Sequence, residues 1–341
     1  MTALASAPSV ALRPVAWSRL AWVTWRRYRI TFAGTTAVLI ALAVDLIITG
    51  HQMRSAYDTL RACSPTTSAK CLFLDQNFHD KYGSTGFVGP LLLLLPGILG
   101  AFVGAPQLAR ELETGTFRYA WTQGVGRMRW AVALLLPGAI GIAVIMAAFG
   151  ALISWHQQPL VDYGASSRLE TSIFPATGLA VAGWTLVAFA LGALSGLVWR
   201  RVLPAMATAF ALWFGLAYLA AQVFRIQYLA PLTSTSLHLS APNFVVSQWW
   251  TKSGIRVSEA DINQKLESLG AHVSGHQVQV HVTPGSVDPF HYLIQHGYRQ
   301  ITSYQPDSRY WTFQWIEFGW LTALALILLG TTFWLLRRRA A

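Results

Sequence analysis

Six long apolar runs limit what this chain can fold into more than any other feature. In order, they cover about residues 30–49, 87–106, 131–153, 173–199, 202–224 and 315–336. A helix of about 20 apolar residues crosses a bilayer. Outside closed β-barrels, a segment in the hydrocarbon can make all its backbone hydrogen bonds only as a helix. The sequence therefore predicts an all-α polytopic membrane protein with six transmembrane helices.

The composition agrees with that prediction and removes one class of partner. The chain is 54% hydrophobic and 11% charged, with a mean hydropathy of +0.42, whereas soluble domains carry about 25% charged residues. The formal net charge of +11 would suggest nucleic acid in a soluble protein. In a membrane protein this net charge is explained by the excess of basic residues in the cytoplasmic loops. We therefore expect the lipid bilayer, and not nucleic acid, as a partner of this chain.

Basic residues are unevenly distributed between the two sides of the predicted membrane. The N-terminal tail, the loop after the second run, the turn after the fourth and the C-terminal tail hold 14 bases and two acids. The remaining loops hold 11 bases and ten acids. The first side is therefore predicted to be cytoplasmic, with both termini there and the protein in the plasma membrane.

This layout predicts four segments. Residues 1–29 form a cytoplasmic tail with an amphipathic interfacial helix, and residues 30–224 hold spans one to five. Residues 225–314 form a small α+β extracellular cap, and residues 315–341 form span six and a basic tail. Within the cap, Ser258-Glu259-Ala260-Asp261 predicts a capped helix that runs to Leu269. Alternating Val278, Val280 and Val282 predict a strand, and residues 288–304 are expected to form a helix that leads back to the membrane.

The loop at residues 109–130, between the second and third runs, has its own pattern. Gly115 allows a break and Thr116 can cap a following helix. Phe117 and Trp121 are four residues apart, so a helix places both rings on one face. Gly124 and Gly126 can end that helix. The loop therefore predicts a short helix on the membrane face, although an ordinary basic loop with aromatic interfacial anchors is the alternative.

This loop resembles the coupling-helix region of ABC-2-type ABC transporter permeases, especially those of the actinobacterial branch. The resemblance is carried by Arg110-Glu111-x-Glu113-x-Gly115-Thr116, the aromatic helix, and Gly124-Val125-Gly126-Arg127-x-Arg129-Trp130. It implies that a set of loop residues docks into a groove on a separate ATP-binding subunit. That set is Arg110, Glu111, Glu113, Gly115, Thr116, Phe117, Arg118, Tyr119, Trp121 and Arg127. Residues 305–317 resemble a signature of the same branch, with an aromatic belt after a proline turn as the alternative.

Three further residues are candidates for special roles. Cys63 and Cys71 lie eight apart in a predicted outer loop, where they can form a disulfide or remain free thiols. Asp45 is taken as the only clear acid inside a span, about 6 Å of helix rise from the interface. It can reach water or pair with an arginine such as Arg54, and we interpret it as a structural or gating acid rather than a proton site.

The sequence contains no recognisable catalytic motif. A phosphate-binding loop needs Gly-x-x-x-x-Gly-Lys, and none of the four lysines (Lys70, Lys81, Lys252 and Lys265) follows a glycine. No HExxH or Gly-x-Ser-x-Gly motif occurs, and the five histidines of residues 272–296 lack the spacing of a zinc site. We therefore expect a non-enzymatic chain with no cofactor or metal, and ATP and Mg²⁺ bound in a partner subunit.

These features together predict the permease subunit of an ATP-driven ABC exporter. Two copies, or this chain and a homologue, would form a dimer around the pathway for an amphipathic or hydrophobic substrate such as an antibiotic, peptide or lipid. One alternative is a secondary transporter driven by an ion gradient, which predicts ionisable residues at mid-membrane and inverted repeats. The other is a membrane sensor or assembly protein that transports nothing.

Overall fold

The structure is a computed structural model that describes residues 17–66, 68–83, 88–115, 126–236, 242–269, 271–274, 277–280 and 289–339. The chain divides into two compact units. The helical unit comprises Met1–Pro159, Thr171–Arg225 and Thr312–Ala341. The mixed unit comprises Leu160–Glu170 and Ile226–Trp311.

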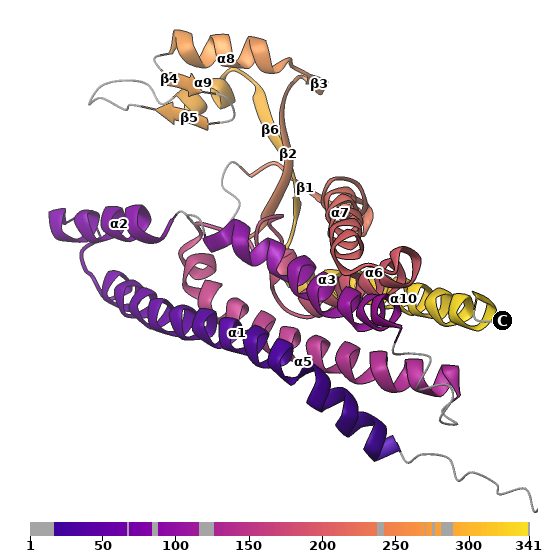
Figure 1. The fold of residues 1–341 in the computed structure, drawn as a ribbon. Helices are drawn as coiled ribbons and strands as arrows, with labels where there is room; N and C mark the ends of the chain where they lie inside the picture. The colour runs from indigo at the N-terminus through magenta and orange to yellow at the C-terminus, as the bar shows by residue number, and fades with distance from the viewer. Residues whose placement is uncertain are drawn as a thin grey trace, which may run out of the picture. The chain divides into compact units, whose positions relative to one another are not determined.

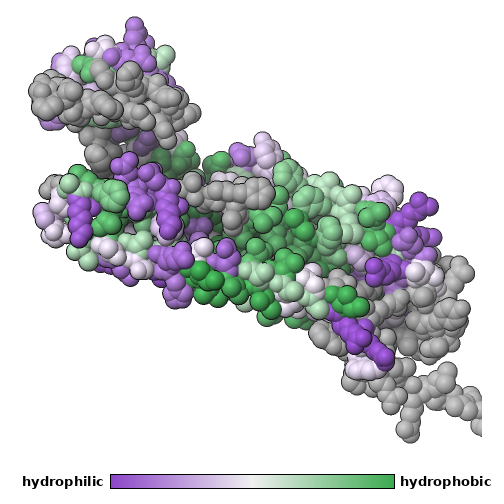
Figure 2. All heavy atoms as spheres, turned by 60° about the vertical axis from the view of Figure 1, so that its left-hand side comes forward, coloured by the Kyte–Doolittle hydropathy of each residue, from purple (hydrophilic) through white to green (hydrophobic). Residues whose placement is uncertain are grey.

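Six helices of the described part are long and apolar enough to cross a membrane, which confirms the predicted fold class. They are α1 (Trp17–Arg61), α3 (Val88–Thr114), α5 (Arg127–Tyr163), α6 (Ala180–Trp199), α7 (Val202–Leu219) and α10 (Tyr310–Arg339) (Figure 1). Large apolar side chains remain exposed on them, such as Leu203 at 79% and Leu326 at 65%. Figure 2 shows a broad apolar area on the helices, with polar side chains toward their ends. Such a surface suits lipid rather than water.

Helix α6 is the centre of the helical unit and is buried along most of its length. It packs against α3, where Gly100 and Gly104 of α3 approach the α6 backbone closely. A methyl group at Gly104 would lie 2.3 Å from the Phe189 carbonyl oxygen, and one at Gly192 would lie 2.6 Å from the Ala105 nitrogen. Only glycine permits this approach of the two backbones, so helix packing here depends on small residues.

The segment at residues 51–86, expected to be a polar loop, contains two helical stretches. Helix α1 continues without a break from Trp17 to Arg61, and α2 (Ala69–Tyr82) follows it. Met53 and Phe78 are both buried, and the Phe78 ring lies 5.9 Å from the Tyr57 ring between centroids. The loop expectation was wrong because this amphipathic segment buries apolar side chains between α1 and α2.

Helix α5 also exceeds its predicted length. The third apolar run was predicted to end at residue 153, but the helix continues to Tyr163, with Pro159 inside it. The Ser154 hydroxyl accepts a hydrogen bond from the Gly178 N–H at 3.2 Å. Ile153 and Gln157 are buried. Burial on one face therefore extends the helix through residues whose polarity suggested a turn.

The mixed unit contains a four-stranded antiparallel sheet in the order β1-β6-β2-β3 and a separate β4-β5 hairpin. The strands are β1 (Leu232–Ser234), β2 (Phe244–Lys252), β3 (Ile255–Arg256), β4 (Ala271–Ser274), β5 (Gln277–Val280) and β6 (Tyr298–Gln305). Helix α8 (Glu259–Ser268) starts as predicted, because the Ser258 hydroxyl accepts from the Asp261 N–H at 3.1 Å. Strand β5 includes the predicted Val278 and Val280, whereas Val282 lies outside the described residues.

The helix expected at residues 288–304 was wrong for its second half. Helix α9 (Pro289–Gln295) is short, Gly297 follows with φ +81°, and β6 then pairs with both β1 and β2. A left-handed glycine ends a helix at no steric cost. Helix α9 contributes Leu293 and Phe290 to a small core around Trp250.

Candidate functional site

Five of the ten loop residues singled out above lie in the described chain. Arg110, Glu111 and Glu113 occupy the last turns of α3, Gly115 follows the helix with φ +69°, and Arg127 begins α5. The other five, Thr116, Phe117, Arg118, Tyr119 and Trp121, lie outside the described residues.

The end of α3 contacts the start of α7. The Glu113 carboxylate accepts a hydrogen bond from the Val202 N–H at 3.4 Å, and a carboxylate at a helix N-terminus is electrostatically favourable. Glu111 is 3% exposed. Nearby, Ala109 of α3 and Ala205 of α7 belong to one small buried cluster. These contacts connect the end of α3 to the start of α7.

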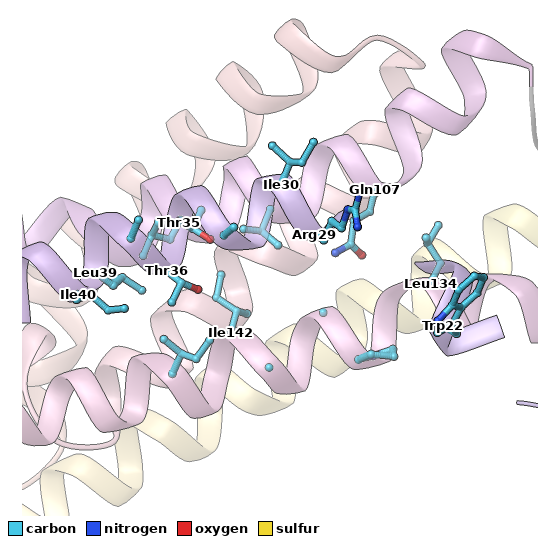
Figure 3. A pocket seen from close by; sticks show the side chains of 18 residues that line it. Trp22, Arg29, Ile30, Thr35, Thr36, Leu39, Ile40, Gln107, Leu134 and Ile142 are labelled. Atoms are coloured by element: carbon cyan, nitrogen blue, oxygen red, sulfur yellow. The ribbon is translucent and has the colours of Figure 1, made fainter. Parts of the chain in front are cut away.

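A large groove lies between α1, α3 and α5, with a volume of about 1120 Å³ (Figure 3). Helices α3 and α5 contribute Leu99, Val103, Gln107, Leu134, Pro137, Gly138, Gly141, Ile142 and Ile145. Helix α1 contributes Trp22, Arg29, Ile30, Ala33, Thr35, Thr36, Ala37, Leu39 and Ile40. The described lining is therefore mainly aliphatic, and Arg29 is its one charged side chain among the residues that the structure describes.

Glycines on α5 shape this groove in two ways. A methyl group at Gly138 would lie 2.5 Å from the Gln107 side-chain nitrogen, so the Gln107 amide packs directly against the backbone at this glycine. A methyl group at Gly141 would meet no atom within 4 Å. Gly141 therefore borders open space in the groove.

A buried ion pair joins three segments of the helical unit. The Glu317 side chain of α10 is 0% exposed and accepts hydrogen bonds from Arg225 at 2.8 and 3.1 Å. It also accepts one from the Trp184 indole N–H of α6 at 2.8 Å. The Arg225 guanidinium carbon lies 4.6 Å from the centre of the Phe174 ring. A π-helical turn, η2 (Ala220–Phe224), comes directly before Arg225, and such turns often mark functional positions.

This pair corrects the expectation that Asp45 is the only acid in a span. Glu317 lies within the sixth apolar helix and is fully buried, whereas Asp45 is exposed. Sequence reasoning took Glu317 as part of the aromatic entry to span six. The available signal was an isolated arginine at the end of span five, which six-span topology places on the same side as the start of span six.

Several polar residues of the 305–317 motif have specific partners. In the helical unit, the Gln314 carbonyl accepts from the Ala180 N–H at 2.8 Å, at the first turn of α6. In the mixed unit, Arg309 donates to the Ala230 carbonyl oxygen at 2.8 Å. Asp307 pairs with Arg168, and this hydrogen bond raises the pKa of Arg168 above its ordinary value. These contacts give the motif a structural role.

The remaining candidates lie around the end of α1. Cys63 and Cys71 are bonded to each other, with their Cα atoms 5.7 Å apart. The Arg54 guanidinium carbon lies 4.2 Å from the centre of the Trp155 ring, and Arg54 donates a hydrogen bond to the Trp155 carbonyl oxygen. Within the described residues, no three His, Cys, Asp or Glu side chains are placed to hold a metal ion.

The fold and the apolar groove define a multi-pass membrane protein. A family model described as ABC-2 membrane transporter related matches residues 36–225, which is more than half of the chain. The chain belongs to this family of ABC transporter permeases, which are membrane subunits and generally non-catalytic. The match includes the loop at residues 109–130 and omits α10. No curated protein and no solved structure matches the chain in the corresponding comparisons.

Proposed function

We propose that this chain is the membrane subunit of an ATP-driven exporter for an amphipathic or hydrophobic substrate. The observation that carries the proposal is the match of the permease family to residues 36–225, which covers the α3 and α5 walls of the groove and the loop at residues 109–130. ATP and Mg²⁺ would be bound by a separate subunit on the cytoplasmic side of the membrane. Both termini of this chain would lie on that same side. A second copy or a homologue would complete the pathway.

Contacts at the end of α3 support the coupling step. A partner that pushes on residues 116–125 would move Gly115 and the last turns of α3. The Glu113 contact with Val202 would transmit this motion to α7. The close approach of Gly196 to the Ala105 carbonyl oxygen, 2.8 Å from a methyl group placed there, would transmit it to α6. Tightly packed backbones move together because they leave no free volume to absorb a displacement.

The lining of the groove supports the substrate class. An apolar trough with a few placed polar groups is the usual form of a site for an amphipathic molecule. Its aliphatic walls disfavour a sugar or an inorganic ion, which would lose hydration without replacement hydrogen bonds.

The buried Glu317 is the observation that favours an ion-gradient transporter, since intramembrane carboxylates often carry protons. Here both carboxylate oxygens accept from Arg225, and one also accepts from Trp184. A carboxylate held by three donors is suited to a fixed structural charge, so this alternative ranks second.

The test is purification of the tagged full-length chain from membranes that also contain a candidate ATP-binding subunit. We expect an ATPase to co-purify and to be lost with the double substitution Phe117→Ala and Trp121→Ala. The matched control is Phe73→Ala with Trp311→Ala, which removes two exposed aromatic rings away from the loop and is expected to retain the ATPase. Transport that needs a proton gradient and no ATPase would contradict the proposal and favour the ion-driven alternative.

A further inference from the structure

We propose that the groove between α1, α3 and α5 binds an anionic membrane amphiphile, with a phosphate head group and an acyl tail, that enters sideways from one leaflet. The inference deepens the proposed function by naming the class of molecule taken up. It rests on that function only for the export step, because binding itself needs neither ATP nor a partner subunit.

The length of the groove suits a tail that crosses one leaflet. Along α5 the lining runs from Leu134 to Ile145, and that helical stretch rises about 16 Å. One leaflet is half of the hydrocarbon core, or about 15 Å. The facing wall on α3 is formed by Leu99 and Val103, both buried. An acyl tail is thus matched in length and chemistry by these walls.

One end of the groove is basic, and the lining residues described at the other end carry no charge. Figure 3 shows Arg29 and Gln107 toward one end and Ile40 toward the other. Arg26 stacks on Trp22, which also lines the groove, with 5.4 Å between the guanidinium carbon and the ring centre. Basic pockets between transmembrane helices attract anionic head groups. The positive end therefore favours an anionic head over a zwitterionic one.

The groove is open on the side where lipid tails would lie. Ile30 is 79% exposed and Ile40 is 58% exposed, although both line it. Leu134, on the inner wall, is 5% exposed. A molecule can therefore enter laterally without passing through the bundle. A transmembrane helix from a second copy would fill the same space, but it would leave the Arg29 end without an anionic partner.

In the experiment, the full-length chain is placed in nanodiscs of equal parts phosphatidylglycerol and phosphatidylcholine. Native mass spectrometry then identifies the lipid that stays bound to the protein after it is released from the nanodisc. We expect phosphatidylglycerol to be retained about five-fold over phosphatidylcholine, the ratio expected from one basic side chain at an anionic surface. Gly141→Phe fills the open space and should remove most of the retained lipid. Gly330→Phe, at an equally open position on α10 outside the groove, should retain it.

The Arg29→Gln variant distinguishes recognition of the lipid head group from binding of the acyl tail. This variant should retain lipid but lose the preference for phosphatidylglycerol. Equal retention by Gly141→Phe and the wild-type chain would overturn the inference, as would equal retention of the two lipids by the wild type. A change of oligomeric state in Gly141→Phe with retained lipid unchanged would also overturn it, in favour of a second copy. Lipid occupancy without ATP-driven movement would count against the export function and leave the site intact.

Discussion

Removing the Glu317 carboxylate tests the account of the buried ion pair most sharply. In Glu317→Ala the Arg225 guanidinium stays in a site where its side chain is only 7% exposed, without its carboxylate. Breaking a buried pair by deleting one partner costs about 3–5 kcal/mol, mainly because the remaining charge is uncompensated. The Trp184 indole N–H loses its acceptor in the same change. We expect the free energy of unfolding to fall by about 3–5 kcal/mol.

The double substitution Arg225→Met with Glu317→Leu separates charge from packing. Replacing a buried pair by apolar side chains of similar volume is often neutral or stabilising. The remaining penalty is the unpaired Trp184 N–H, which costs about 1–3 kcal/mol. The double variant should therefore be more stable than Glu317→Ala, although it lacks one more native polar side chain.

The assay is reversible unfolding of the purified chain in mixed micelles with increasing dodecyl sulfate, followed by tryptophan fluorescence. Three tryptophans near the ion pair can report on unfolding, because the centre of the Trp184 ring lies 6.0 Å from that of Trp213 and 5.7 Å from that of Trp320. A Glu317→Ala variant as stable as the wild type would refute the reasoning. A double variant as unstable as the single one would show that packing, not the uncompensated charge, sets the loss.

Two further predictions concern packing and the disulfide. Gly104→Ala places a methyl group 2.3 Å from the Phe189 carbonyl oxygen and should lower the free energy of unfolding by about 1–3 kcal/mol through overpacking. The control is Gly330→Ala, because a methyl group there has no atom within 4 Å. Equal effects of the two changes in the same unfolding assay would contradict this prediction. Cys63→Ser with Cys71→Ser should lower the free energy of local opening around α2 by about 2–3 kcal/mol, measured by amide hydrogen exchange, and unchanged exchange in α2 would show that the disulfide does not constrain it.

The sequence alone determined the features that the bilayer or local chemistry imposes. Six apolar runs became six helices because backbone groups in hydrocarbon must be satisfied within the segment. Ser258 predicted a helix start because its hydroxyl can accept from an N–H three residues on. Each of these rests on contacts within one segment or on the solvent around it.

Only the tertiary structure decided features that depend on partners distant in sequence. Residues 298–304 were expected to be helical, but residues 298–305 form β6 because β1 and β2 pair with them on either side. Glu317 is buried because Arg225 and Trp184 meet it from two other segments. The groove exists because one face of α1 meets α3 and α5 without filling the space between them. Sequence spacing along one helix cannot show which neighbour a side chain meets, because that depends on how the helices pack.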